Sequence, residues 1–138
     1  LKGKSSKLVS ISDQTCEFAV VNPNFLGIKS NYSWMACTER KTGNAPLQAI
    51  KKINLETKEE LFWSAAPKGF VSEPIMVPRE GSKYEDEGYL LVLIWNGSRR
   101  GSDLLILNSC NLEELATYEL PINIPHGLHG SWANEKLI

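Results

Sequence analysis

Residues 50–61 read IKKINLETKEEL, and residues 104–115 read LLILNSCNLEEL. Each segment has an apolar run, a polar turn that ends in Glu-Glu and a further apolar residue, which is typical of a β-hairpin. Asn54 matches Asn108, the Glu-Glu-Leu triplets match as well, and every matched pair is 54 positions apart. A repeat of roughly 40–50 residues built from short strands is typical of β-propeller blades. Ordinary hairpins share this turn chemistry, so the matches leave both interpretations open.

Short segments with strand character continue through most of the chain. They are rich in apolar, β-branched and aromatic residues, and Gly, Pro, Asn and Asp separate them. No window of about 12 residues keeps a helical period, and we expect at most one helical turn, at 111–115. The sequence therefore predicts an all-β fold with mostly antiparallel strands. The expected strands are 7–12, 16–21, 32–38, 47–55, 60–64, 73–77, 88–95, 102–108 and 115–120.

The length of the chain limits how much of a propeller it can hold. With 138 residues it suits one domain or part of one. If the repeat is real, this length holds about two to three blades, whereas a propeller closes with about four to eight. Two or three blades leave open sheet edges, so further residues or further copies of the chain are needed to complete a ring.

Composition argues for an ordinary globular protein. The formal net charge is -1 and 22% of the residues are charged. There is no long run of one sign, so neither nucleic acid nor an anionic membrane is implied as a partner. No apolar run approaches the roughly 18–20 residues of a membrane span, and we see no signal peptide. Cys16, Cys37 and Cys110 form an odd, widely spaced set, which favours reduced, buried thiols in an intracellular protein over a disulfide framework.

Candidate chemistry gathers near the end of the chain. His126 and His129 are the two histidines of the sequence, and they lie in PHGLHGSW at 125–132. A His-x-x-His pair can ligate a metal, but three residues of extended chain can turn the rings to opposite faces. Exposed turn histidines are the simpler interpretation, and without a third ligand cluster a complete metal site inside this chain is not expected. The acidic run at 85–87 is interpreted as a solvated loop.

Three segments, in this order, resemble the carotenoid cleavage oxygenase (retinal pigment epithelial membrane protein) family. The first is CEFAVVNP at 16–23. The second is SEPIMVP at 72–78, followed by EDEGYLLV at 85–92 and LLIL at 104–107. The third is IPHGLHGSW at 124–132. The likeness runs from the first segment almost to the end of the chain and looks strongest to the cyanobacterial apocarotenoid and carotenoid dioxygenases.

The resemblance implies a fold and a metal. The family fold is a seven-bladed β-propeller with Fe(II) on its axis, held by four histidines from different blades. Residues 1–138 would then form one partial propeller domain, the C-terminal two to three blades. The last ligand of the family matches His129, directly before Gly130. His126 falls where other members carry other residues, so we interpret it as a near neighbour and not a ligand.

The resemblance also assigns two glutamates. Glu17 and Glu73 match family glutamates that accept a hydrogen bond from the far nitrogen of a ligand histidine. Such a carboxylate fixes the tautomer, aims the metal-binding nitrogen and raises its basicity. Without the resemblance, Glu17 would be interpreted as an outward-facing strand residue and Glu73 as a strand-entry residue at the surface. Ala19 departs from the family, which usually has proline there, and this affects packing more than chemistry.

For activity, the resemblance implies a non-haem Fe(II) dioxygenase. Such an enzyme cleaves a carbon–carbon double bond of a carotenoid, apocarotenoid or stilbene-like substrate with O₂ and yields two carbonyl products. Three of the four ligand histidines have no counterpart here, so we expect this chain to be inactive without the N-terminal blades. No catalytic residue is expected beyond the metal site. We expect a lipophilic polyene or stilbene as the substrate.

Other readings remain open. One alternative is a truncated, non-catalytic β-propeller-derived binding or structural module. Another is self-assembly, in which several copies of the chain complete a ring. We expect an intracellular protein, soluble or peripherally membrane-associated, with a plastid as the compartment if the source is a plant or alga. No nucleic-acid partner is expected, and peripheral membrane contact is open for the parent enzyme.

Overall fold

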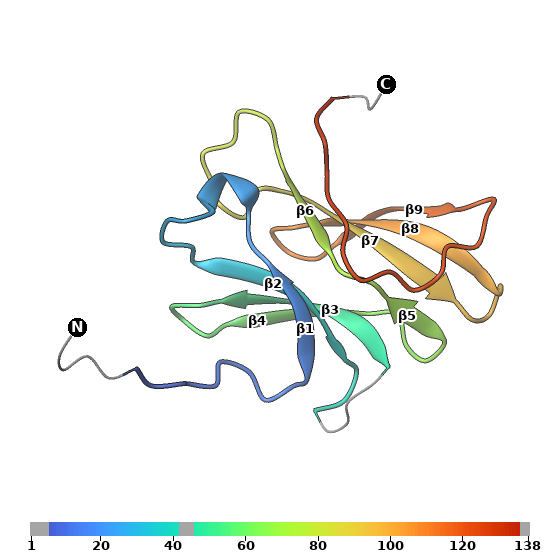
Figure 1. Ribbon diagram of the computed structural model, residues 1–138, viewed down its shortest axis with the longest axis horizontal. Helices are drawn as coiled ribbons and strands as arrows, with labels where there is room; N and C mark the ends of the chain where they lie inside the picture. The colour runs from blue at the N-terminus through green and yellow to red at the C-terminus, as the bar shows by residue number, and fades with distance from the viewer. Residues whose placement is uncertain (1–5, 42–45, 136–138) are drawn as a thin grey trace.

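The computed structural model describes residues 6–41 and 46–135 of the chain (Figure 1). Within these residues the chain forms nine β-strands and one three-residue 3-10 helix, so the predicted all-β class is confirmed. In the described part, no helix has the length and apolar character needed to cross a membrane. The elements are β1 (Cys16–Val20), η1 (Pro23–Phe25), β2 (Tyr32–Thr38), β3 (Leu47–Asn54), β4 (Glu60–Ser64), β5 (Gly69–Val71), β6 (Ile75–Pro78), β7 (Gly88–Asn96), β8 (Gly101–Asn108) and β9 (Glu114–Glu119).

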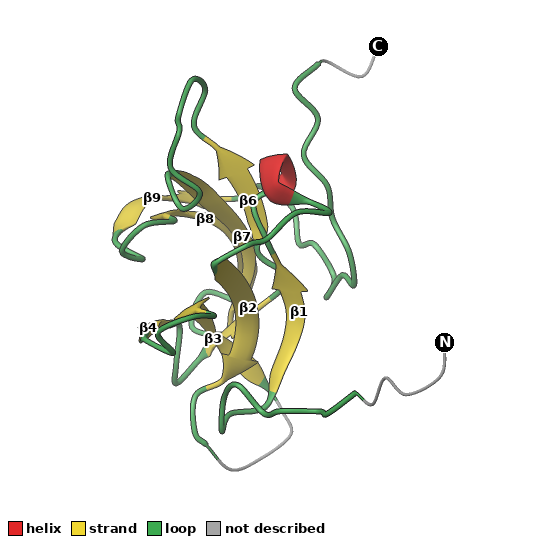
Figure 2. Cartoon of the chain, turned by 90° about the vertical axis from the view of Figure 1, so that its left-hand side faces the viewer, coloured by secondary structure: helices red, strands yellow, loops and turns green. Residues whose placement is uncertain are grey.

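The strands form two antiparallel sheets, one from each half of the chain. The first sheet has the order β1-β2-β3-β4, and the second has the order β5-β7-β8-β9 with β6 also paired to β7. Figure 2 shows the two sheets stacked one above the other. Sequential strands joined by hairpins give the arrangement of a propeller blade. The described chain thus has two blade-like sheets, the lower end of the predicted two to three blades.

The two hairpins that resemble each other in sequence also have the same turn. The Lys58 N–H donates to the Asn54 carbonyl at 2.8 Å, and the Leu112 N–H donates to the Asn108 carbonyl at 2.8 Å. Lys58 and Leu112 both have positive φ, 68° and 60°. Each asparagine side chain also accepts the backbone N–H two positions on, at 2.9 and 2.8 Å. The turn geometry supports the interpretation of a structural repeat.

An apolar core fills the space between the two sheets. Trp34 of β2 is fully buried there, and its indole Nε1 donates to the Ser109 carbonyl at 2.9 Å, so the ring joins the first sheet to the second. Both sheets contribute their inward-facing side chains, as alternation along a strand requires. The buried cluster comprises Trp34, Ala36, Ile50, Val71, Met76, Leu90, Val92, Ile94, Leu105, Leu107 and Leu112.

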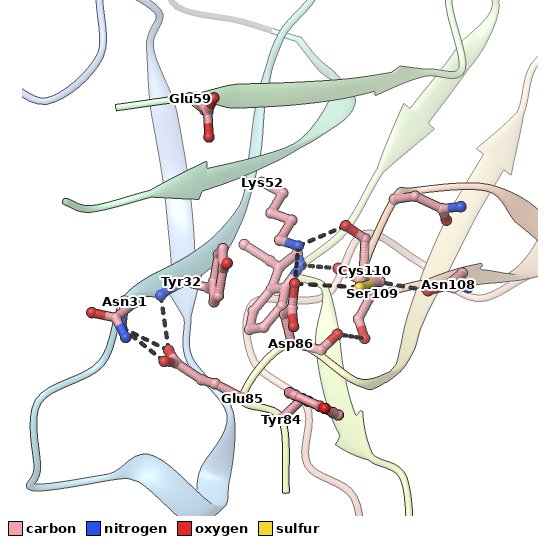
Figure 3. Close-up of polar contacts among 12 residues, drawn as sticks. Asn31, Tyr32, Lys52, Glu59, Tyr84, Glu85, Asp86, Asn108, Ser109 and Cys110 are labelled. Carbon is pink, nitrogen blue, oxygen red and sulfur yellow. Dashed lines mark hydrogen bonds and ion pairs between the residues drawn. The ribbon is translucent and has the colours of Figure 1, made fainter. Parts of the chain in front are cut away.

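A buried lysine adds a polar contact between the sheets (Figure 3). Lys52 of β3 lies 2.6 Å from the Asp86 carboxylate and donates to the Cys110 carbonyl at 2.6 Å. Its ammonium group also lies 4.4 Å from the centroid of the Tyr32 ring. A buried charge needs this many partners because its hydration is lost. Cys110 is exposed, so the expectation of buried cysteines is wrong for this one.

Glu85, next to Asp86 in the loop between β6 and β7, also binds residues at the start of β2. Its carboxylate accepts the Ser30 hydroxyl at 2.6 Å and the backbone N–H groups of Asn31 and Tyr32 at 2.8 Å each. The Asn22 side chain donates to the Glu85 carbonyl at 2.8 Å. Glu85 is only 7% exposed. The prediction of a solvated acidic run at 85–87 is therefore wrong for Glu85 and for Asp86, because partners distant in sequence surround them.

Other differences from the sequence prediction are local. Residues 7–12 do not form a strand; this segment is exposed apart from Ser12. Residues 111–115 form the β8–β9 turn and the start of β9, not a helical turn. Two short elements were not predicted: β5, which is too short for a periodic signal, and η1, which begins after the Asn22 side chain caps the Asn24 N–H at 2.9 Å.

Candidate metal-ligand site

Residues 124–132, called the histidine segment below, are held against the second sheet by Ser102 near the start of β8. The Ser102 hydroxyl accepts the Ile124 N–H at 2.8 Å and lies 3.2 Å from the Ile124 carbonyl, to which it is placed to donate. Past this anchor, the chain runs beside β5 and β6, as the red segment of Figure 1 shows. The segment thus lies against the second sheet without forming a strand of its own.

Glu73, in the short connection before β6, binds the segment at two points. One carboxylate oxygen lies 3.2 Å from Nδ1 of His129, and the other accepts the Gly130 N–H at 2.8 Å. Glu73 is largely buried, with 13% of its side chain exposed, whereas the His129 side chain is 74% exposed. A carboxylate can only accept, so this contact favours a proton on Nδ1 and leaves the lone pair on Nε2. Within the described residues, no hydrogen bond or ion pair reaches Nε2.

The first sheet also contributes to the site, through Phe18. The Phe18 ring meets the His129 ring edge-on, with centroids 5.8 Å apart and planes at 90°. Phe18 has a positive φ of 56°, and the pairing of β1 with β2 shifts register between Glu17 and Val20. The bulge re-aims the side chains of this edge strand. His129 therefore lies where the two sheets meet, between an aromatic ring and a carboxylate.

The other predicted site residues lie apart from this contact. Glu17 is on β1 opposite Ala36, it is exposed, and its side chain has no hydrogen bond or ion pair within the described residues. The His126 ring lies edge-on to Phe70 of β5, with centroids 6.3 Å apart. The structure thus brings together Glu73 and His129. The assigned roles of His129, Glu73, Glu17 and His126 stay predictions.

A small apolar cavity of about 90 Å³ lies under the histidine segment. Gly130 packs against its wall so closely that an added Cβ would lie 2.8 Å from Cδ1 of Ile75. A larger residue after His129 would require the end of the Ile75 side chain to move aside. The cavity is lined by Ser72, Glu73, Ile75, Leu91, Leu93, Leu104, Gly127, Leu128, His129 and Gly130.

The donor set fits one ligand position and not a whole metal site. Among the described residues no group of three or more His, Cys, Asp or Glu side chains could hold a metal ion. A neutral imidazole with a carboxylate behind it is, however, the usual form of a single histidine ligand. The residues present could therefore supply one ligand position, at Nε2 of His129.

Comparison with known proteins decides the family. The model of the retinal pigment epithelial membrane protein (RPE65) family matches residues 1–134. This chain belongs to that family. It is 47% identical over 120 residues to the apocarotenoid-15,15'-oxygenase of Synechocystis sp., a match that covers 86% of this chain and 24% of the relative. The resemblance inferred from the motifs is confirmed.

More distant relatives include cleavage enzymes for other substrates. The chain is 34% identical over 113 residues to carotenoid cleavage dioxygenase 8 of Arabidopsis thaliana, covering 81% of the chain and 19% of the relative. It is 28% identical over 129 residues to lignostilbene-alpha,beta-dioxygenase isozyme III of Sphingomonas paucimobilis, covering 86% and 26%. The family thus joins carotenoid, apocarotenoid and stilbene cleavage enzymes.

Solved structures agree on the fold. The structure of cobalt-substituted Synechocystis apocarotenoid oxygenase superposes with a TM-score of 0.86 at 45% identity, covering 89% of this chain and 26% of that one. The chain therefore has the fold of part of a β-propeller enzyme. It spans about a fifth to a quarter of the length of these relatives.

Sequence reasoning missed Phe18 as a neighbour of the histidine. The phenylalanine lies in the segment CEFAVVNP at 16–23, directly after Glu17, so the sequence places it within a segment that resembles the family. Its contact with His129 depends on the bulge in β1 and on a separation of more than a hundred residues, and neither has a local sequence signal.

Proposed function

We propose that this chain is the C-terminal part of a non-haem Fe(II) dioxygenase that oxidatively cleaves a carbon–carbon double bond of a carotenoid, apocarotenoid or stilbene-like substrate. The observation that carries the proposal is the contact of Glu73 with Nδ1 of His129, found in a chain of this family. In the proposal His129 supplies one of four imidazole ligands, and the other three come from N-terminal blades. Bound Fe(II) would supply the activation of O₂.

The described residues have three tasks in this proposal. Glu73 holds the Nδ1 proton of His129, so that Nε2 keeps its lone pair for the metal. Gly130 lets the backbone approach Glu73 and fixes the direction of the ring. Phe18 covers one edge of the imidazole and helps to exclude water. Glu17 would hold a histidine from a preceding blade in the same way, and its exposure in this chain is consistent with a partner from outside it.

The test uses the complete polypeptide that carries this sequence, first sized in its source cells with an antibody against residues 72–88. We expect His129→Ala to lower bound iron per chain at least tenfold and to abolish cleavage of an apocarotenal by O₂. Glu73→Gln should weaken iron binding roughly 10–100-fold. His126→Ala is the matched control and should keep both iron and activity. Equal iron loss in His126→Ala and His129→Ala would contradict the assignment of the ligand.

A second candidate is a non-catalytic binding or structural module of propeller origin. The supporting observation is that the sequence has two histidines in total, fewer than the four ligands of the proposed centre. A native polypeptide near 15.4 kDa, without stoichiometric iron, would favour this candidate. A polypeptide of several hundred residues with about one iron per chain would exclude it.

The proposal extends to partners and place in the cell. The substrate is a lipophilic polyene or stilbene, so peripheral contact of the complete enzyme with a membrane is part of the proposal, as is an intracellular location. Sedimentation of the complete enzyme with lipid vesicles tests the first, and fractionation of the source cells tests the second.

A further inference from the structure

Two cysteines that are distant in sequence lie directly opposite each other in the first sheet. Cys16 of β1 pairs with Cys37 of β2 in the antiparallel register. The Thr38 N–H donates to the Thr15 carbonyl at 3.1 Å, so 15 and 38 are a hydrogen-bonded pair. Pairs alternate along an antiparallel ladder, which makes Cys16 and Cys37 a non-hydrogen-bonded pair.

That register gives the two thiols the spacing of a disulfide. Non-hydrogen-bonded partners have Cα atoms about 4.5 Å apart, and their side chains point to the same face of the sheet. Disulfides span Cα separations of about 4.4–6.8 Å. In the described structure both cysteines are free thiols. Their spacing in the sequence argued against a disulfide framework, but the hairpin-like return of β2 along β1 removes that argument.

The surroundings allow an oxidant to reach one sulfur and not the other. Cys16 is partly exposed at the sheet edge, whereas Cys37 is fully buried. Nearby, the ammonium group of Lys51 is held by the Ser12 hydroxyl at 2.8 Å and Glu60 at 2.7 Å. Burial raises the pKa of the Cys16 thiol, while Lys51 and hydrogen bonds with Ser12 and Cys37 oppose that rise. Cys16 is thus the sulfur suited to first attack.

We propose that Cys16 and Cys37 form a modification site, a dithiol that small disulfide oxidants close into a cross-strand disulfide. The Cys16 thiolate attacks one sulfur of the oxidant RS–SR, which releases RS⁻ and forms a mixed disulfide. Cys37 then loses its proton, its sulfur attacks the Cys16 sulfur, and the second RS⁻ leaves. The two released thiolates take up the two protons, so two protein thiols are oxidised and one RS–SR is reduced to two RSH.

The test is peptide mapping of the folded, reduced protein after incubation with excess oxidised glutathione, followed by blocking of free thiols and digestion with trypsin. We expect peptides 8–29 and 30–40 to appear linked, since these carry Cys16 and Cys37. The linked peptides should carry no glutathione, whereas the exposed Cys110 takes up glutathione by the same exchange, so the peptide linkage and not the thiol count is the readout in this chain. Closure should be about tenfold faster at pH 8 than at pH 7, because the thiolate fraction rises tenfold.

Two variants separate this pair from other thiol chemistry. Cys110→Ser keeps the pair, and its free-thiol count should fall from two to zero. Cys37→Ser removes the second step, so glutathione should stay on Cys16. In the unsubstituted protein, a stable glutathione adduct on Cys16, linkage of peptide 101–136 to either partner, or three thiols that remain free would each overturn the proposal. Mapping of the complete polypeptide gives the same readout, because it follows only these peptides.

Discussion

Lys52 and His129 each place a nitrogen against an acidic side chain, yet the two regions differ in how fully their groups are satisfied. Lys52 is 5% exposed and has a carboxylate, a carbonyl and an aromatic ring around its ammonium group. His129 has one ring nitrogen on Glu73, and its side chain is 74% exposed. The Lys52 ammonium group thus has its partners within the chain. Within the described residues, His129 has a partner at one of its two ring nitrogens.

The difference separates the structural role of Lys52 from the role proposed for His129. A buried ion pair whose partners all come from the same chain joins the two sheets, and removing one member leaves an uncompensated charge. An exposed imidazole that is fixed at Nδ1 and open at Nε2 gains little stability from its position. The cost of aiming that ring is explained if a further group binds at Nε2.

The largest expected effect is on the interior. Lys52→Met should lower the free energy of unfolding by about 3–5 kcal/mol, because Asp86 would stay buried without its cation. Chemical denaturation followed by tryptophan fluorescence measures the change. Lys29→Met is the matched control, since Lys29 and Glu56 form a surface pair 3.6 Å apart with side chains 76% and 69% exposed.

The control should lose no more than about 0.5 kcal/mol. Lys52→Met with Asp86→Leu should recover part of the loss, because no unpaired charge remains. If Lys52→Met and Lys29→Met unfold at the same denaturant concentration, Lys52 is not a structural link between the sheets.

Glu85 should follow with a smaller effect. Glu85→Ala removes the acceptor of the Ser30 hydroxyl and of two backbone N–H groups, which should cost about 2–3 kcal/mol. Glu85→Gln keeps one acceptor oxygen and should cost less. Glu80→Ala, in the same loop, is the control. If Glu85→Ala and Glu80→Ala have equal unfolding midpoints in urea, the Glu85 carboxylate contributes no more to stability than a solvated one does.

Much of the fold could be predicted from sequence because its signals are local. Segments 32–38 and 60–64 were predicted with the bounds that β2 and β4 have, since turn residues flank both strands. The match of Asn54 with Asn108 predicted a repeat, and both turns proved to have the same hydrogen bonds.

The polar interior could not be predicted because its partners are remote. Glu85 is satisfied by residues 30–32, more than fifty positions away, so the run at 85–87 had no local sign of burial. For His129, the residues alone favoured an exposed turn, and the family resemblance supplied the role. In the structure the His129 side chain is exposed and its Nδ1 lies 3.2 Å from Glu73, and its role as a metal ligand stays a prediction.

The buried Cys37 thiol allows a third test of the interior, because its ionisation makes the free energy of unfolding depend on pH. Burial raises the pKa of its thiol from 9.0 to about 12, so the folded state keeps the proton that the unfolded state releases. The free energy of unfolding is therefore unaffected by this thiol below pH 9 and falls as pH rises from 9 toward 12. At pH 10.5 the expected decrease is about 2 kcal/mol. Cys37→Ala is less stable at pH 7 but lacks this loss, so the gap between the two unfolding curves should narrow with pH. Parallel curves from pH 8 to 10.5 would contradict a buried thiol.

The smallest effect on stability is expected at Glu73, and there the readout is the imidazole itself. Glu73→Ala should cost about 1 kcal/mol or less, because the partners that Glu73 would lose, His129 and Gly130, are themselves exposed. ¹H–¹⁵N correlation spectra of the His129 ring should show the Nδ1-protonated tautomer in the unsubstituted chain and a mixture in Glu73→Ala. Glu17→Ala is the matched control, a glutamate of the other sheet with no partner within the described residues, and it should leave the His129 spectrum unchanged. If Glu73→Ala leaves the tautomer unchanged, the carboxylate does not orient the ring. The role proposed for the Glu73–His129 contact would then be wrong.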